Sequence, residues 1–85
     1  SDYKMRDILS DMAAYYIAIG DTHFAAEIIG MTSSHPHLLE MTRVSSIEPL
    51  VTQLYAVISP QELAKSFTRG RNQSIEALVD RVLGA

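Results

Sequence analysis

The chain has no cysteine and no tryptophan, and its aromatic side chains are limited to four Tyr and two Phe. Without cysteine it can form neither a disulfide nor a thiolate metal site. No apolar run approaches the roughly 18 residues that a membrane-spanning helix needs, and the first residues do not resemble a signal peptide. These absences are consistent with a cytoplasmic domain whose core is filled by Leu, Ile, Val, Met and Ala.

Basic residues are also few. Seven Lys and Arg stand against ten Asp and Glu, and the formal net charge is −3. Proteins that bind nucleic acid usually carry a clustered basic surface, whereas the local basic pair of Arg69 and Arg71 is too small to form such a patch. We therefore expect no direct binding of nucleic acid. The pair stays a candidate contact for an anion or an acidic partner, although arginines at a helix end also complement the helix dipole.

The clearest structural signal is the corner of a helical hairpin at Gly20. Glycine ends helices because it adopts the left-handed conformation without steric cost, and Asp21 or Thr22 can cap the next helix. Ala25 and Ala26 are small enough to let this second helix approach the first closely. No stretch alternates with a period of two, so the sequence predicts an all-α fold without strands.

Apolar periodicity predicts the first two helices over residues 3–19 and 22–32. Two neighbouring apolar stripes run along the first helix. One stripe comprises Ile8, Met12, Tyr15 and Ile19, and the other comprises Leu9, Ala13 and Tyr16. A helix that is apolar over so wide an arc usually packs on two sides, so we expect a second neighbour besides the next helix. The expected inner face of the second helix comprises Phe24, Ala25, Ile28 and Ile29.

The pattern from Leu38 onward is helical but interrupted by Pro49, because proline inside a helix removes a hydrogen bond and clashes one turn back. Two interpretations remain open. Either a short helix over 38–44 gives way to a new helix with Pro49 in its first turn, or one helix is kinked. The break is favoured because Ser45 and Ser46 supply a ready cap for the new helix. The expected inner face comprises Ile47, Leu50, Val51, Leu54, Tyr55 and Ile58.

The strongest local signal is the segment Ser59-Pro60-Gln61-Glu62. Ser59 is an N-cap, Pro60 occupies the favoured first helical position, and Glu62 completes a capping box. The helix that follows is expected to stop at Gly70. Its expected inner face comprises Leu63, Ala64 and Phe67.

Ser74 is expected to cap a last helix over residues 75–83, which Gly84 ends. Its expected inner face comprises Ile75, Leu78, Val79 and Val82. The sequence thus predicts five helices, or six if the third segment breaks.

The first hairpin resembles a tetratricopeptide repeat. Tyr16 precedes the turn at Gly20, and Ala13 and Ala25 are the small residues between the two helices, although Leu9 stands where that family often has Trp. The resemblance implies a hairpin over residues 1–34 and capping helices over 35–85, which together form the end of an α-solenoid.

Motifs along the whole chain extend this resemblance. They are Gly20-Asp21, Ala25-Ala26, Ser34-His35-Pro36, Ser59 to Leu63, Arg69-Gly70-Arg71 and Ser74 to Val79. In this order they resemble the ending that closes the helical-repeat region of large bacterial signalling proteins. Such proteins include STAND-type ATPases, repeat-containing transcriptional activators and cyclase-linked regulators. The resemblance implies a C-terminal scaffold excised from a longer chain, and it brings no catalytic residue with it.

The histidines and serines indicate no catalytic or metal site. His35 and His37 flank a proline and cannot share a helical face, and the sequence has no His-x-x-x-His pair and no Glu-x-x-His motif. Ser59 and Ser74 lack the Gly-x-Ser-x-Gly elbow of a nucleophile. The four glycines are isolated at helix ends, and so they form no phosphate-binding loop. We therefore expect no enzymatic activity, no cofactor and no metal.

The candidate residues for partner contact are Ile8, Met12, Tyr15, Tyr16, Arg69 and Arg71. Adjacent tyrosines on a helix point about 100° apart, so one of the pair is expected in the core and the other at the surface. We expect an exposed apolar strip that includes Tyr3, Ile8, Met12, Tyr15 or their neighbours to contact another copy or an upstream repeat. The leading function is a non-enzymatic helical-repeat module that binds protein or stacks within its own parent chain. We expect it not to bind a membrane. The alternative is a small-molecule sensor that binds its effector between the first hairpin and the third segment.

Overall fold

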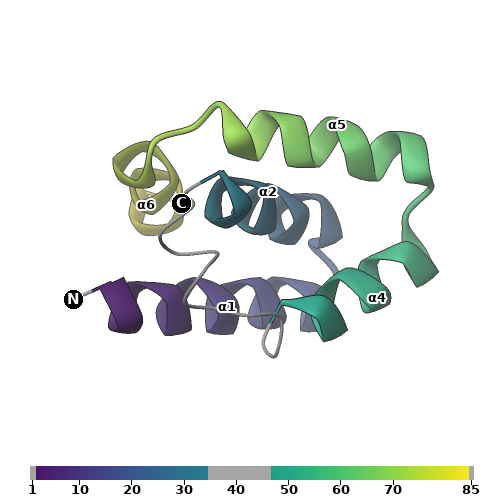
Figure 1. The fold of residues 1–85 in the computed structure, drawn as a ribbon, viewed down its shortest axis with the longest axis horizontal. Coiled ribbons are helices and arrows are strands. Elements are labelled where there is room, and N and C mark those ends of the chain that lie inside the picture. The colour runs from purple at the N-terminus through teal and green to yellow at the C-terminus, as the bar shows by residue number, and fades with distance from the viewer. Residues whose placement is uncertain (1, 35–46, 85) are drawn as a thin grey trace.

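The computed structural model describes residues 2–34 and 47–84, with side chains from Ile8 onward in the first helix (Figure 1). These residues form five helices and no strand: α1 Asp2–Ala18, α2 Thr22–Ser33, α4 Glu48–Val57, α5 Pro60–Arg71 and α6 Ile75–Gly84. The all-α prediction is confirmed for them. The expected helix over 38–44 lies outside the described residues.

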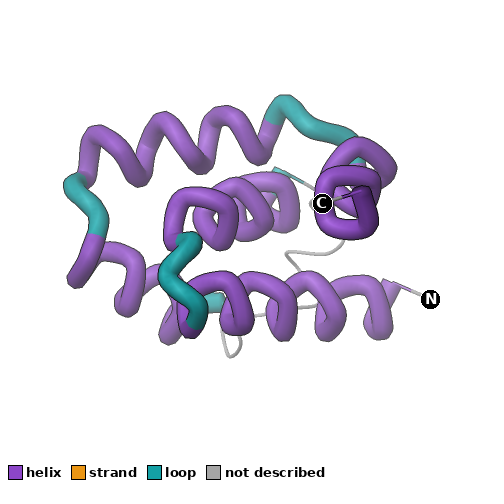
Figure 2. Tube along the Cα trace, turned by 180° about the vertical axis from the view of Figure 1, so that it is seen from behind, coloured by secondary structure: helices purple, strands orange, loops and turns teal. Residues whose placement is uncertain are grey.

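The central element is α2. Every residue from Phe24 to Thr32 is buried, because α1 and α5 pack on opposite sides of this helix and α4 and α6 flank it (Figure 1). The view from behind shows the same enclosure, with α6 seen nearly end-on (Figure 2). The predicted inner face of α2 was therefore too narrow. Met31 and Ala26 are also buried, since a helix covered on all sides becomes core around its whole circumference.

The corner between α1 and α2 has the predicted chemistry. Gly20 has a φ of 92°, and its N–H donates to the carbonyl of Ile17 while the N–H of Asp21 donates to the carbonyl of Tyr16. These two bonds form a Schellman motif, which satisfies carbonyls at the end of α1. Asp21 is the N-cap of α2, because its Oδ1 accepts a hydrogen bond from the N–H of Phe24 over 3.3 Å.

The serine caps predicted for the last two helices are confirmed. Ser59 Oγ accepts from the N–H of Glu62 over 3.2 Å, and Pro60 is the first residue of α5. Ser74 Oγ accepts from the N–H of Ala77 over 3.0 Å. Each cap satisfies one N–H group that the first helical turn cannot bond internally.

Helix α4 begins later than expected. It starts at Glu48 with Pro49 in its first turn, and Ile47 occupies the N-cap position without a side-chain hydrogen bond. Ile47 thus stands at the cap position, and the expected cap residue Ser46 lies outside the described residues. The predicted place of Pro49 in the first turn is confirmed. Most of the predicted inner face is also confirmed, but Tyr55 is 58% exposed. That correction follows from packing, because α4 turns only a narrow face toward the core.

Gly70 does not end α5, which continues through it to Arg71. Gly70 is buried where α5 crosses α2, and a Cβ atom there would overlap the backbone of Glu27. A Cβ atom on Gly30 of α2 would likewise meet the backbone of Phe67. The two glycines thus allow backbone-to-backbone contact between the helices. The interpretation of every glycine as a helix terminator was wrong for this pair.

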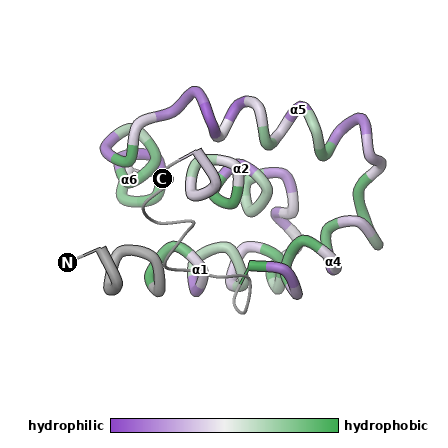
Figure 3. The backbone as a smooth tube through the Cα atoms, viewed as in Figure 1, coloured by the Kyte–Doolittle hydropathy of each residue, from purple (hydrophilic) through white to green (hydrophobic). Residues whose placement is uncertain are grey.

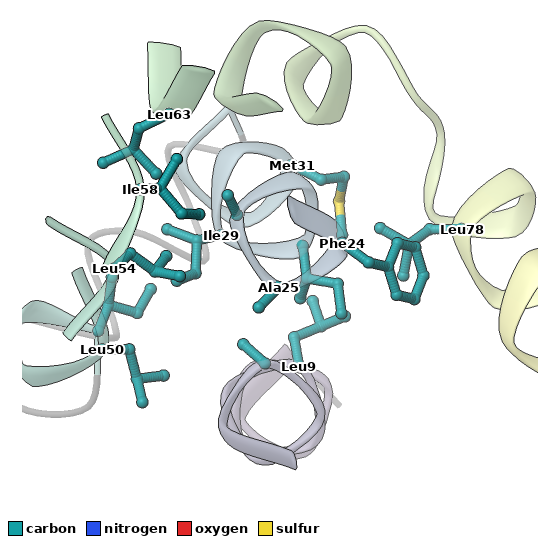
Figure 4. Packing of buried hydrophobic residues seen from close by; sticks show 14 residues of the cluster. Leu9, Phe24, Ala25, Ile29, Met31, Leu50, Leu54, Ile58, Leu63 and Leu78 are labelled. Atoms are coloured by element: carbon teal, nitrogen blue, oxygen red, sulfur yellow. The ribbon is translucent and has the colours of Figure 1, made fainter. Parts of the chain in front are cut away.

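Because of this crossing, the buried face of α5 differs from the predicted one. Leu63 and Ser66 are buried and Phe67 is half-buried, whereas Ala64 is exposed. Hydrophilic and apolar residues alternate along α5 (Figure 3). The core is continuous across all five described helices (Figure 4). Labelled side chains in it come from α1 (Leu9), α2 (Phe24, Ala25, Ile29 and Met31), α4 (Leu50 and Leu54), α5 (Leu63) and α6 (Leu78), with Ile58 following α4.

Candidate functional site

One face of α1 exposes a line of large apolar side chains. Ile8 is 52% exposed, Tyr15 59% and Ile19, just past the helix end, 57%. These three residues are seven and four positions apart, a spacing that aligns them on one side of a helix. We call them the α1 row. Met12 lies beside the row but is half-buried against the core.

The other apolar stripe of α1 has the opposite role. Leu9 and Ala13 are buried, and α1 packs along α2 through this side. The predicted exposure is therefore confirmed for Ile8 and Tyr15, and the side chain of Tyr3 lies outside the described residues. Burial of one stripe packs the helix against α2, so the exposed α1 row lies on the opposite side of a packed helix.

The adjacent tyrosines divide between core and surface, as expected. The Tyr16 ring is half-buried and meets the Phe24 ring edge-on, with 4.7 Å between centroids. The exposed Tyr15 ring meets the Tyr16 ring in a similar T-shaped contact at 5.3 Å. An aromatic path therefore connects the α1 row with the interior at the start of α2.

An open pocket of about 560 Å³ lies between the α1–α2 corner and α6. It is lined by Tyr16, Asp21, Phe24, Asp80, Arg81 and Gly84. Its position differs from the one expected for an effector, since α6 rather than the third segment forms its second wall. Sequence reasoning did not anticipate a role for Asp80 or Arg81.

Beside this pocket, the buried carboxylate of Glu27 contacts cationic side chains of α5 and α6. Glu27 on α2 accepts hydrogen bonds from Nη1 of Arg81 over 2.5 Å and from Nε2 of Gln73 over 2.6 Å. Nε of Arg69 lies 3.6 Å from the same carboxylate. Buried charges require such compensation. The guanidinium of Arg81 also stacks on the Phe24 ring, 4.5 Å from its centroid.

The two arginines proposed for partner contact have different local partners. Arg69 is drawn toward Glu27 and donates to Ser66 Oγ over 2.9 Å. Arg71 is exposed and donates to Thr68 Oγ1 over 3.2 Å. Much of the charge of Arg69 is thus used within the protein, which leaves Arg71 as the freer of the two.

The only histidine in the described range, His23, is exposed and lies 3.8 Å from Oε2 of Glu62. Oε1 of Glu62 is 3.8 Å from Nζ of Lys65, so the carboxylate of the expected capping box has two side-chain neighbours. His35 and His37 lie outside the described part. Within residues 2–34 and 47–84, no three His, Cys, Asp or Glu residues gather as metal ligands would.

The helices described here also lack the combination of length and apolar character needed to cross a bilayer. No protein-family model, curated protein or solved structure matches the chain. Three features remain as candidate sites. They are the α1 row, the open pocket, and the Glu27 carboxylate with its neighbours Arg69, Gln73 and Arg81.

Proposed function

We propose that this chain is a non-enzymatic helical scaffold that binds another protein segment through the α1 row. In the finer form of the proposal it caps a tetratricopeptide-like superhelix in a bacterial signalling or transcription regulator of the cytoplasm. The resemblance of the hairpin to such repeats supports that finer form. The occupant of the row is then an upstream repeat of the parent chain or a helix of another protein.

The observation that carries the proposal is the exposure of Ile8, Tyr15 and Ile19 along one line of α1. The line is about 16 Å long at 1.5 Å per residue, which matches the face of a partner helix. Full burial of such a side chain is worth about 1.5–3 kcal/mol. Covering the exposed half of each therefore contributes about 1 kcal/mol per residue.

The buried stripe of α1 strengthens the proposal. Leu9 and Ala13 hold the helix against α2, so binding to the opposite side requires little ordering of the backbone. A surface that is already rigid loses less conformational entropy on association. Other large exposed apolar residues, such as Val57 and Leu83, lie on separate helix ends and form no comparable line.

The test is an NMR titration of the labelled chain with a neutral amphipathic helical peptide. A peptide of about 18 residues is long enough to hold a helix, with Leu on one stripe and Gln on its flanks. Shift changes should centre on Ile8, Met12, Tyr15 and Ile19. The substitution Ile8→Glu should abolish them, and the matched control Val57→Glu should preserve them.

Shifts spread evenly over the surface, or shifts that Ile8→Glu leaves intact, would remove the α1 row from the proposal. Light scattering of the unsubstituted chain tests whether a second copy of the chain occupies the α1 row. Self-association that Ile8→Glu abolishes would identify another copy as the partner.

The alternative function is a small-molecule sensor, and the open pocket supports it. Its volume falls in the range of ligand sites, and Tyr16 and Phe24 supply aromatic walls. A compound that raises the melting temperature and shifts the resonances of Phe24 and Asp80, but not those of Ile8, would favour this function. The substitution Tyr16→Ala should then lower the affinity for the compound and leave peptide binding to the α1 row unchanged.

A further inference from the structure

Acidic side chains border the α1 row and line the neighbouring pocket. Asp11 is exposed on α1, three residues after Ile8 and four before Tyr15, positions that adjoin both on a helix surface. Asp21 and Asp80 are exposed at the pocket. Tyr15 contacts Tyr16, and Tyr16 lines the pocket. The row and the pocket therefore form one continuous surface.

None of these three carboxylates has an ion pair among the residues that the structure describes. The carboxylate of Asp21 accepts the cap hydrogen bond from the backbone N–H of Phe24. Arg81 also lines the pocket, and its guanidinium donates to the buried carboxylate of Glu27. The surface thus combines exposed apolar side chains with carboxylates that have no ion-pair partner in the described part of the chain.

We infer that the partner is an amphipathic helix whose apolar stripe is flanked by lysine or arginine. Its apolar stripe lies along the α1 row, and one cationic side chain enters the pocket between Asp21 and Asp80. Tyr16, half-buried in the wall of the pocket, suits such a group, since aromatic rings attract cations. The inference rests on the proposed function and adds the chemistry of the partner.

Charge complementarity favours this partner over a second copy of the chain. A second copy would bring the same acidic border to the interface, and like charges brought together across an interface are unfavourable. A basic helix instead compensates each carboxylate. Opposite charge also accelerates association at low salt.

The test compares three helical peptides that share one apolar stripe and differ only in flanks of Lys, Gln or Glu. We expect the Lys peptide to bind tightest, the Glu peptide weakest, and the difference to shrink as salt increases. Asp21→Asn and Asp80→Asn should each lower the affinity for the Lys peptide about two- to fivefold, the effect expected when an exposed ion pair is lost. Asn keeps the cap of α2 intact, and Glu48→Gln on α4 is the control for net charge.

The outcomes separate this inference from the proposed function. If no peptide binds, the α1 row is not a binding face, and both the proposed function and the basic partner are overturned. If all three bind equally, the row stands and the basic partner is overturned. A Lys peptide with a scrambled stripe that binds as well, or a loss with Glu48→Gln equal to that with Asp80→Asn, would reduce the effect to general attraction and also overturn it.

Discussion

Helices α5 and α6 both pack against α2, but they do so by different physical means. The α5 contact is made by backbone, with Gly70 against Glu27 and Gly30 against Phe67. The α6 contact depends on side chains. Leu78 is its one buried residue, and Arg81 reaches the carboxylate of Glu27. Glu27 contacts both neighbours, since its main chain meets α5 and its side chain binds Arg81 of α6 and lies near Arg69 of α5.

This difference indicates which contact tolerates change. Backbone contact depends on the absence of two Cβ atoms and has no room to adjust. A side-chain ion pair can rearrange, because Arg81 is about half exposed and regains water when its partner is lost. We therefore expect α5 to be part of the global folding unit and α6 to open locally at lower free energy.

Among the substitutions at the contacts of α5 and α6 with α2, the largest effect should come from Gly70→Ala. The new methyl group overlaps the backbone of Glu27, so α2 and α5 must separate, at a cost of about 3 kcal/mol in the free energy of unfolding. Urea denaturation measures it. Gly84→Ala is the control, because a Cβ atom there meets nothing within 4 Å. Equal stability of both variants would mean that the helices do not touch as described.

A smaller and more local effect is expected for Arg81→Ala. The substitution removes a hydrogen bond to a buried carboxylate, worth about 1.5–3 kcal/mol, while Arg69 and Gln73 continue to serve Glu27. Amide hydrogen exchange should increase in α6 and stay unchanged in α5. Exchange that rises equally in both helices would contradict the independent opening of α6.

The two serine caps extend the comparison to the helix starts. Ser59→Ala at the start of α5 and Ser74→Ala at the start of α6 each remove a confirmed cap, which costs about 0.5–2 kcal/mol. If α5 belongs to the global unit, Ser59→Ala should lower the unfolding midpoint. Ser74→Ala should instead speed hydrogen exchange within α6. An unchanged midpoint for Ser59→Ala would count against the coupling of α5 to the fold.

The smallest effect on stability is expected for Ile8→Glu, at most about 0.5 kcal/mol, because the side chain lies outside the core. The neighbouring Leu9→Ala should cost about 2–5 kcal/mol, since Leu9 is buried and its loss leaves a cavity. Thermal unfolding of the two variants compares the stripes of α1 directly. A large loss with Ile8→Glu would place the α1 row inside the fold and remove it as a binding face.

The elements that sequence reasoning predicted well are those set by local chemistry. The Gly20 corner, the caps by Asp21, Ser59 and Ser74, and the start of α5 at Pro60 all depend on atoms within a few residues of one another. Backbone preferences and cap hydrogen bonds act at that range in any fold. The all-α class and the starts of α2, α5 and α6 could therefore be predicted from the residues alone.

The tertiary structure decided what depends on which helices meet. Periodicity marked both stripes of α1 as apolar, and only packing against α2 made Leu9 core and left Tyr15 exposed. Gly70 carries the same local signal as Gly20, yet contact with α2 keeps it inside a helix. Glu27 and Arg81 are separated by 54 residues, and no local rule joins them. Their pairing arises because burial of a carboxylate demands a cation, and the fold determines which one is near.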